Sequence, residues 1–158
     1  MIASLCVPFV LNESYTLNVL QSRIHGLDHW YRVWQNAKML NGEESLADME
    51  VVALFCLFHD SMRVNDGDDS HHGLRAIKLW ERLNEVLPGL NQHYTQQQDE
   101  LFFEACVEHS NGETSSDPTI AVCWDADRLD LHRVGIWPDP RFMSTEEGVT
   151  LTTRRIKA

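Results

Sequence analysis

Basic residues are scarce in this sequence. Its 158 residues include 13 lysines and arginines against 24 aspartates and glutamates, a formal net charge of -11. A protein that binds a nucleic-acid backbone needs a net basic surface, so this balance argues against a nucleic-acid partner. An acidic enzyme that acts on a phosphate ester would have to supply positive charge locally, from metal ions and a few arginines.

Cysteines are also few, and no apolar run is long. The four cysteines lie far apart, which indicates small core residues in a reducing compartment and excludes a CxxC site. Residues 1–11 are apolar but lack the basic segment of a signal peptide and are interrupted by Pro8. No stretch reaches the roughly 20 apolar residues that cross a membrane. We therefore expect a soluble cytoplasmic protein with no membrane partner.

Strand-like alternation is hard to find, whereas helical patterns with start and stop signals recur. The length and the 43% hydrophobic content fit one globular domain over residues 1–158. Capping boxes at Ser45/Asp48 and Thr95/Gln98 and the pair Asp117-Pro118 indicate three helix starts. The predicted helices cover residues 27–40, 45–60, 70–87, 95–110 and 117–133, with a loop over 61–69 and an unassigned tail over 136–158. The sequence predicts a single all-α domain.

The adjacent pair His59-Asp60 is the most informative feature. It follows the continuously apolar run 51–58, so an ionisable pair lies at the end of a buried helix. This placement costs several kcal/mol unless a cation or another partner compensates. A neutral imidazole and a carboxylate together form a natural ligand set for a divalent cation. One such pair can arise by chance, so its weight depends on other inward-facing residues.

Helical periodicity of about 100° per residue indicates which polar side chains point inward. Asp127 shares a face with Trp124 and Leu131, and His109 shares one with Cys106. The inward-facing polar residues in or next to the other four predicted helices are His25, His29 and Arg32, then His72, His109 and Asp127. Four residues that point away or precede a helix are left out of the ligand set: Asp125, His132, His71 and His93.

Simpler interpretations exist for each residue. A single inward histidine, such as His72 or His109, is more often a hydrogen-bonded core residue than a ligand. Asp127 could cap a neighbouring helix or pair with Arg32. The spacing of His25 and His29 imitates a zinc-protease helix, but glycine stands where that motif needs glutamate. A shared metal site explains all of these inward residues together.

The pattern resembles the HD-domain superfamily of metal-dependent phosphohydrolases. The matching residues are His29, the pair His59-Asp60, and Asp127 within Asp-Ala-Asp-Arg-Leu, and the likeness extends over residues 22–134. It implies a bundle of roughly five to seven helices with a metal in a central cleft. Some members bind a second metal through two further histidines, and His72 and His109 occupy such positions. Nothing matches the Gly-Tyr-Pro extension of cyclic-di-GMP phosphodiesterases. The run Asp-Ala-Asp-Arg-Leu-Asp is similar to that of small stand-alone HD proteins, so the likeness names no substrate.

The resemblance also implies a mechanism. His29, His59, Asp60 and Asp127 would hold one divalent ion (Mn, Fe, Zn, Co, Ni or Mg), and His72 and His109 would hold a second or contact substrate. A metal-bound hydroxide would attack a small phosphate ester, for which a nucleotide is the favoured class. Asp60 is the expected catalytic residue, since its two oxygens can bind one metal each. The candidates for binding the phosphate group are Arg32, Arg63 and His25, whereas Arg75 and Arg128 fit structural ion pairs better.

Two other functions remain open. A few HD-fold enzymes use the same four histidines and two aspartates to bind two iron ions and cleave a carbon bond with oxygen. A binding module that holds a metal and a nucleotide without turnover is the third possibility. Metal identity distinguishes the oxygenase from the hydrolase, and product formation distinguishes the hydrolase from the binding module.

Overall fold

Helices make up the regular structure in the described part of the chain. The computed structural model describes residues 2–42 and 46–156, and these contain seven α-helices, four short 3₁₀ helices and no strand. The α-helices are α1 (Ile2–Thr16), α2 (Leu27–Asn41), α3 (Met49–Phe58), α4 (His72–Val86), α5 (Gln96–Glu108), α6 (Pro118–Arg128) and α7 (Glu146–Ile156). The 3₁₀ helices are η1 (Val19–Gln21), η2 (Leu90–Gln92), η3 (Leu131–Val134) and η4 (Pro140–Phe142). The all-α class and the range of five to seven helices are confirmed.

Capping side chains begin three of these helices near the predicted positions. Asp48 accepts hydrogen bonds from two backbone N–H groups in the first turn of α3. Thr95 and Gln98 form a reciprocal capping box at the start of α5, and Asp117 caps α6 ahead of a proline at the first helical position. These bonds satisfy donors that have no partner within the helix. Ser45, the other half of the first predicted capping box, lies outside the described residues.

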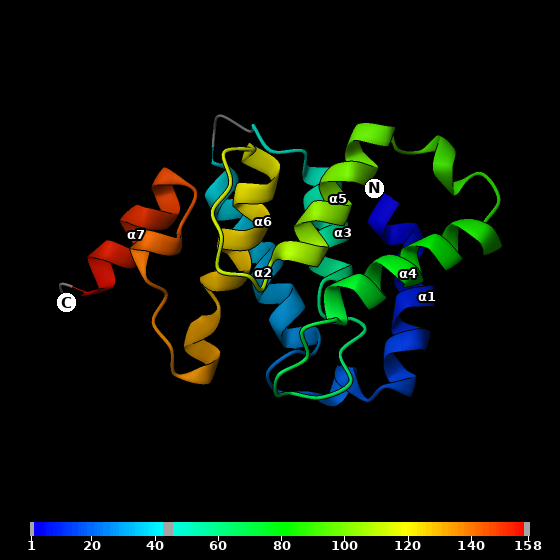
Figure 1. The fold of residues 1–158 in the computed structure, drawn as a ribbon, viewed down its shortest axis with the longest axis horizontal. Coiled ribbons are helices and arrows are strands. Elements are labelled where there is room, and N and C mark those ends of the chain that lie inside the picture. Colours follow the sequence, from blue (N-terminus) through cyan, green and yellow to red (C-terminus); the bar gives the residue numbers. More distant parts are fainter. Residues whose placement is uncertain (1, 43–45, 157–158) are drawn as a thin grey trace.

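The helix α3 lies at the centre of the bundle. It packs against α1, α2, α5 and α6, and Figure 1 shows it in the middle of the helical layers. Seven of its residues are buried, and the run from Val51 to Phe58 is apolar around the whole helix, as expected for a helix enclosed by others. The chain leaves this helix directly into His59 and Asp60, which are 0% and 2% exposed. The pair therefore lies inside the molecule.

The structure departs from the predicted helices at both ends of the chain. α1 continues through Pro8. Proline has no N–H group, so the carbonyl oxygen of Ser4 loses its hydrogen bond within the helix. The helix tolerates this loss because Ser4 and Pro8 both lie on its exposed side. The last core helix was expected to reach about residue 133 but ends at Arg128, and the chain turns into η3. The unassigned tail forms α7, whose start is held by Asp125: this carboxylate accepts hydrogen bonds from the backbone N–H groups of Ser144 and Thr145.

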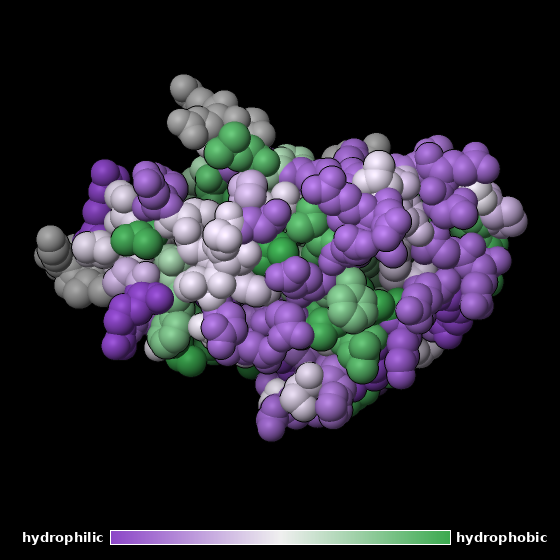
Figure 2. Space-filling view, turned by 45° about the horizontal axis from the view of Figure 1, so that its top comes forward, coloured by the Kyte–Doolittle hydropathy of each residue, from purple (hydrophilic) through white to green (hydrophobic). Residues whose placement is uncertain are grey.

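The surface and the cysteines fit the rest of this arrangement. Figure 2 shows hydrophilic residues over most of one face, with hydrophobic residues in small patches between them. All four cysteines are buried and free, as expected for core residues. Among the described residues, no helix is long and apolar enough to cross a lipid bilayer.

Candidate metal centre

Four buried histidines meet at helix ends. His29 lies in the first turn of α2 and His72 is the first residue of α4, while His59 and His109 cap the C-terminal ends of α3 and α5. Each is at most 5% exposed. Two carboxylates join them, Asp60 directly after α3 and Asp127 in α6. The structure thus brings the six predicted metal ligands together from five helices.

The Nδ1 atom of each of these histidines faces an oxygen. The distances are 2.7 Å from His29 to Asp130 Oδ2, 3.0 Å from His59 to Phe55 O, 2.5 Å from His72 to Asp69 O and 2.7 Å from His109 to Cys106 O. A carbonyl or carboxylate oxygen can only accept, so Nδ1 carries the proton in each ring. In the neutral imidazole the Nε2 atom is then left with a free lone pair.

These Nε2 atoms face each other in two pairs. The distance is 3.1 Å between His29 and His59, and 2.9 Å between His72 and His109. Two lone pairs at such a distance repel each other, so a proton or another cation has to lie between them. A cluster of imidazole lone pairs and carboxylates is the donor set that a divalent transition-metal ion prefers. The arrangement therefore fits a metal ion.

The pKa values show what replaces a cation when no metal is bound. Burial acts to lower the pKa of His29, but its bonds to Asp127, Asp130 and Asp60 outweigh burial and raise the value to about 10. Burial lowers the pKa of His59 to about 3. In the pair of His29 and His59, a proton on His29 thus takes the place of a metal ion, and His59 stays neutral.

Asp60 lies between the two histidine pairs. Its Oδ2 atom is 3.3 Å from Nε2 of His29 and 3.6 Å from Nε2 of His59. Its Oδ1 atom is 3.2 Å from Nε2 of His72 and 3.9 Å from Nε2 of His109. Burial opposes the charge of this carboxylate, but the surrounding histidines hold its pKa well below the usual value. Each oxygen of Asp60 therefore serves one pair.

The potential ligands form two groups of three. One consists of His29, His59 and Asp127, and the other of Asp60, His72 and His109; within each group the ligand atoms lie within 4.8 Å of one another. The Oδ1 atom of Asp127 is 3.2 Å from Nε2 of His29, and its side chain is 17% exposed. Burial acts against the charge of Asp127, but the neighbouring histidines lower its pKa. These buried groups could each hold a metal ion.

Asp130 was not among the predicted site residues, yet it supports the centre. It is fully buried, accepts a hydrogen bond from Nδ1 of His29, and binds Arg32 through Oδ1 at 2.7 Å and Oδ2 at 3.0 Å. A carboxylate behind a metal-binding histidine fixes the ring and makes it a stronger ligand. The available signal was the third aspartate in the run 125–130, but the predicted helix continued past it.

The predicted phosphate-binding residues divide into two sets. His25 Nδ1 lies 2.8 Å from Oδ2 of Asp60, and Arg63 Nε lies 2.9 Å from Oδ1 of the same residue. Both line a cavity of about 470 Å³ that also reaches Asp127. Arg32 is not among the described residues that line it, and its guanidinium group is bound to Asp130. The site thus gathers His25 and Arg63 but not Arg32.

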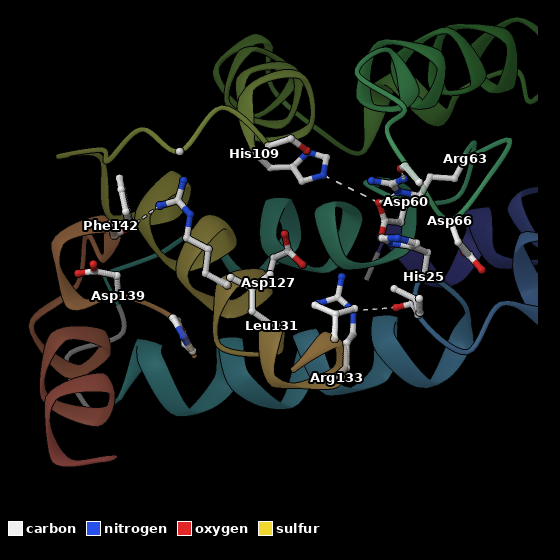
Figure 3. A pocket seen from close by; sticks show the side chains of 17 residues that line it. His25, Asp60, Arg63, Asp66, His109, Asp127, Leu131, Arg133, Asp139 and Phe142 are labelled. Atoms are coloured by element: carbon white, nitrogen blue, oxygen red, sulfur yellow. Dashed lines mark hydrogen bonds and ion pairs between the residues drawn. The ribbon is translucent and has the colours of Figure 1, made fainter. Parts of the chain in front are cut away.

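The cavity combines the ligand groups with basic and apolar walls. Figure 3 shows His109, Asp60 and Arg63 towards one side and Phe142 with Asp139 at the other. Its basic residues besides His25 and His109 are Arg63, Arg128 and Arg133, and its apolar wall includes Ile24, Leu131, Val134 and Phe142. The arrangement suits a small ligand that has both an anionic group and an apolar part.

Comparison with known proteins identifies no relative of this chain. The chain matches no family model, no curated protein and no solved structure. The resemblance to the HD-domain superfamily consequently stays a prediction that depends on a few motif residues, and function has to be inferred from the site itself.

Proposed function

We propose that this protein is a divalent-metal-dependent phosphohydrolase of the HD-domain type that acts on a small phosphate ester, with nucleotides as the first class to test. The observation that supports this most is the convergence of four imidazole Nε2 atoms on the two oxygens of Asp60. Such a set favours a pair of cations that share one carboxylate, an arrangement common to enzymes that stabilise both the attacking and the leaving oxygen of a displacement.

The ligand assignment follows from the two groups. His29, His59 and Asp127 would hold one ion, and His72 and His109 would hold the other, with Asp60 shared between them. A bound divalent ion supplies a Lewis acid that lowers the pKa of water and offsets the negative charge of a phosphoryl group. The chain's own contribution is to fix this geometry, since each imidazole is held through Nδ1.

Two cavity residues keep Asp60 in place. His25 and Arg63 each bind one of its oxygens, so the carboxylate cannot rotate away from the histidine pairs. Arg63 also donates to the carbonyl oxygens of Asn65 and Gly67, which ties it to the loop over residues 61–69. Removing Arg63 is therefore expected to disturb the ligand geometry as well as any contact with substrate.

Charge supports an anionic substrate in spite of the acidic composition. The protein has a net charge of -11, so a phosphate ester needs local positive charge to approach. The arginines of the cavity supply part of it, and bound cations would supply the rest.

The test is phosphate release from a panel of nucleotides and simple phosphate monoesters, with manganese, cobalt, magnesium or zinc added to chelated protein. We expect metal-dependent release that falls at least about a hundred-fold in Asp60→Asn, because a shared ligand is lost. Asp68→Asn, an exposed aspartate in the neighbouring loop, is the matched control and should keep full activity.

Other outcomes would point to other functions. Full activity of folded Asp60→Asn in the absence of metal would overturn the proposal. Bound iron with an optical change on exposure to oxygen would favour an oxygenase. Tight nucleotide binding without product over long incubation would favour a binding module.

A further inference from the structure

Two guanidinium groups in the cavity have a buried nitrogen that no described residue binds. These atoms are Nη2 of Arg128 and Nη1 of Arg133. Arg128 is 7% exposed and the side chain of Arg133 is 9% exposed. Both residues line the same cavity as Asp127 and Asp60. A buried cationic N–H group without an acceptor is costly, so such a group in a concave site indicates a missing anionic partner.

The other half of each guanidinium group is firmly held. Arg128 donates from Nη1 to the carbonyl oxygen of Phe142 at 2.6 Å, and its guanidinium carbon lies 5.6 Å from the centroid of the Trp124 ring. Arg133 donates from Nε to the carbonyl oxygen of Ile24 at 2.8 Å, and the same Nε lies 3.9 Å from Oδ2 of Asp130. The dashed line at Phe142 in Figure 3 marks the first of these bonds. Both side chains are thus oriented before any ligand binds.

Arg63 differs from these two residues. Its Nε donates to Asp60 and its Nη1 donates to two loop carbonyls, so its known bonds serve the metal centre and the loop. The acidic residue near Arg128 at the cavity rim, Asp139, is paired with Arg141 at 2.7 Å. Among the described residues that line the cavity, Arg128 and Arg133 are therefore the arginines that have a buried nitrogen without a hydrogen-bond acceptor.

The position of these residues separates them from Asp60. Figure 3 places Phe142 and Asp60 at opposite sides of the cavity, with Arg133 between them. Because Arg128 is bonded to Phe142, its guanidinium group lies on the side away from Asp60. Leu131 and Val134 also line the cavity and would contact an apolar part of the ligand.

We propose that Arg128 and Arg133 bind a second anionic group of the substrate, distinct from the phosphate held at the metal centre. The substrate class is then a small phosphate ester that has another phosphate or a carboxylate. This inference rests on the proposed function for the first anionic group, but the arginine site itself needs no metal. A guanidinium group is suited to it because its planar fork matches the geometry of an oxyanion.

The test is titration of inorganic phosphate into chelator-treated protein, followed by calorimetry. We expect the parent protein to bind phosphate, and Arg128→Met and Arg133→Met each to weaken binding about ten-fold or more, since each removes a charged hydrogen bond. Methionine retains most of the apolar volume. Arg154→Met removes one exposed charge elsewhere and should bind as the parent does.

Further variants separate this inference from the proposed function. Asp60→Asn should bind phosphate at least as well as the parent without metal, because it alters the metal centre and leaves both arginines. If Arg128→Met unfolds because its bond to Phe142 is lost, Arg128→Lys keeps the charge and is still expected to bind more weakly. No phosphate binding by the parent, or binding unchanged in folded Arg133→Met, would overturn the inference whatever the hydrolase assay shows.

Discussion

Replacing Asp130 with asparagine tests whether a residue outside the metal-ligand groups controls metal binding. Asp130 is fully buried and lies behind His29, whose Nδ1 donates to it over 2.7 Å. The same carboxylate accepts two hydrogen bonds from Arg32. Asparagine has nearly the same shape but no charge, so the variant changes the electrostatics of His29 with little change in packing.

The expected effects follow from these bonds. Loss of the carboxylate behind a metal-binding histidine weakens metal affinity by about ten- to hundred-fold, which corresponds to about 1.4–2.8 kcal/mol. The metal-free protein should also lose about 2 kcal/mol of its free energy of unfolding, since hydrogen bonds to a charged group are lost. This figure is modest because Arg32 is partly exposed and its charge is screened by solvent.

The assay is calorimetric titration of manganese or cobalt into chelated protein, with urea unfolding measured alongside. Asp68→Asn is the control for the loss of one carboxylate charge, because Asp68 is exposed and outside both ligand groups. Metal affinity of folded Asp130→Asn within about two-fold of the parent would refute the reasoning. It would mean that the bond from Asp130 to His29 does not set the strength of that ligand.

Four further predictions concern pH, metal and packing. Because His29 is protonated up to about pH 10 in the metal-free protein, a metal ion has to displace a proton. The affinity for metal should therefore rise about ten-fold per pH unit from pH 7 to 9, which titration of metal in several buffers would show. The raised pKa also stabilises the metal-free protein fully below about pH 6.5, and urea unfolding should show this contribution disappear as the pH rises through about 10. Metal at about 100 times its Kd should add about 2.7 kcal/mol to the free energy of unfolding and raise Tm by about 5–10 °C in a thermal scan, and chelator should reverse this. Gly73→Ala should cost about 2 kcal/mol or more in urea unfolding, because a Cβ atom there would lie 2.0 Å from the carbonyl oxygen of Cys106, whereas Gly67→Ala in the loop should have little effect.

Local signals were sufficient to predict the core helices. A capping box, an Asp-Pro start and a terminal glycine each depend on residues within one turn, so the boundaries of α2 and α5 were predicted closely. The tail was different, because α7 begins where Asp125, twenty residues away in sequence from Thr145, accepts its first N–H groups. A hydrogen bond between residues so far apart in the sequence leaves no local pattern that would predict the start of α7.

The sequence predicted which side chains gather in the candidate site, but not what surrounds them. Periodicity alone directed His72, His109 and Asp127 inward, and the structure places them in the two ligand groups. The interactions behind the ligands depend on three-dimensional contacts between different helices. Asp130 binds His29 across a separation of 101 residues in the sequence. Neither this bond nor the bond between Asp130 and Arg32 could be derived from residue spacing.

The most direct test of the account is the metal content of protein purified without chelator, measured by mass spectrometry for the parent and Asp60→Ala. We expect two divalent ions per chain in the parent and loss of both in the variant, because the two oxygens of Asp60 face different histidine pairs. Absence of metal from the parent, with none taken up on titration, would contradict the account and leave the four histidines as core residues.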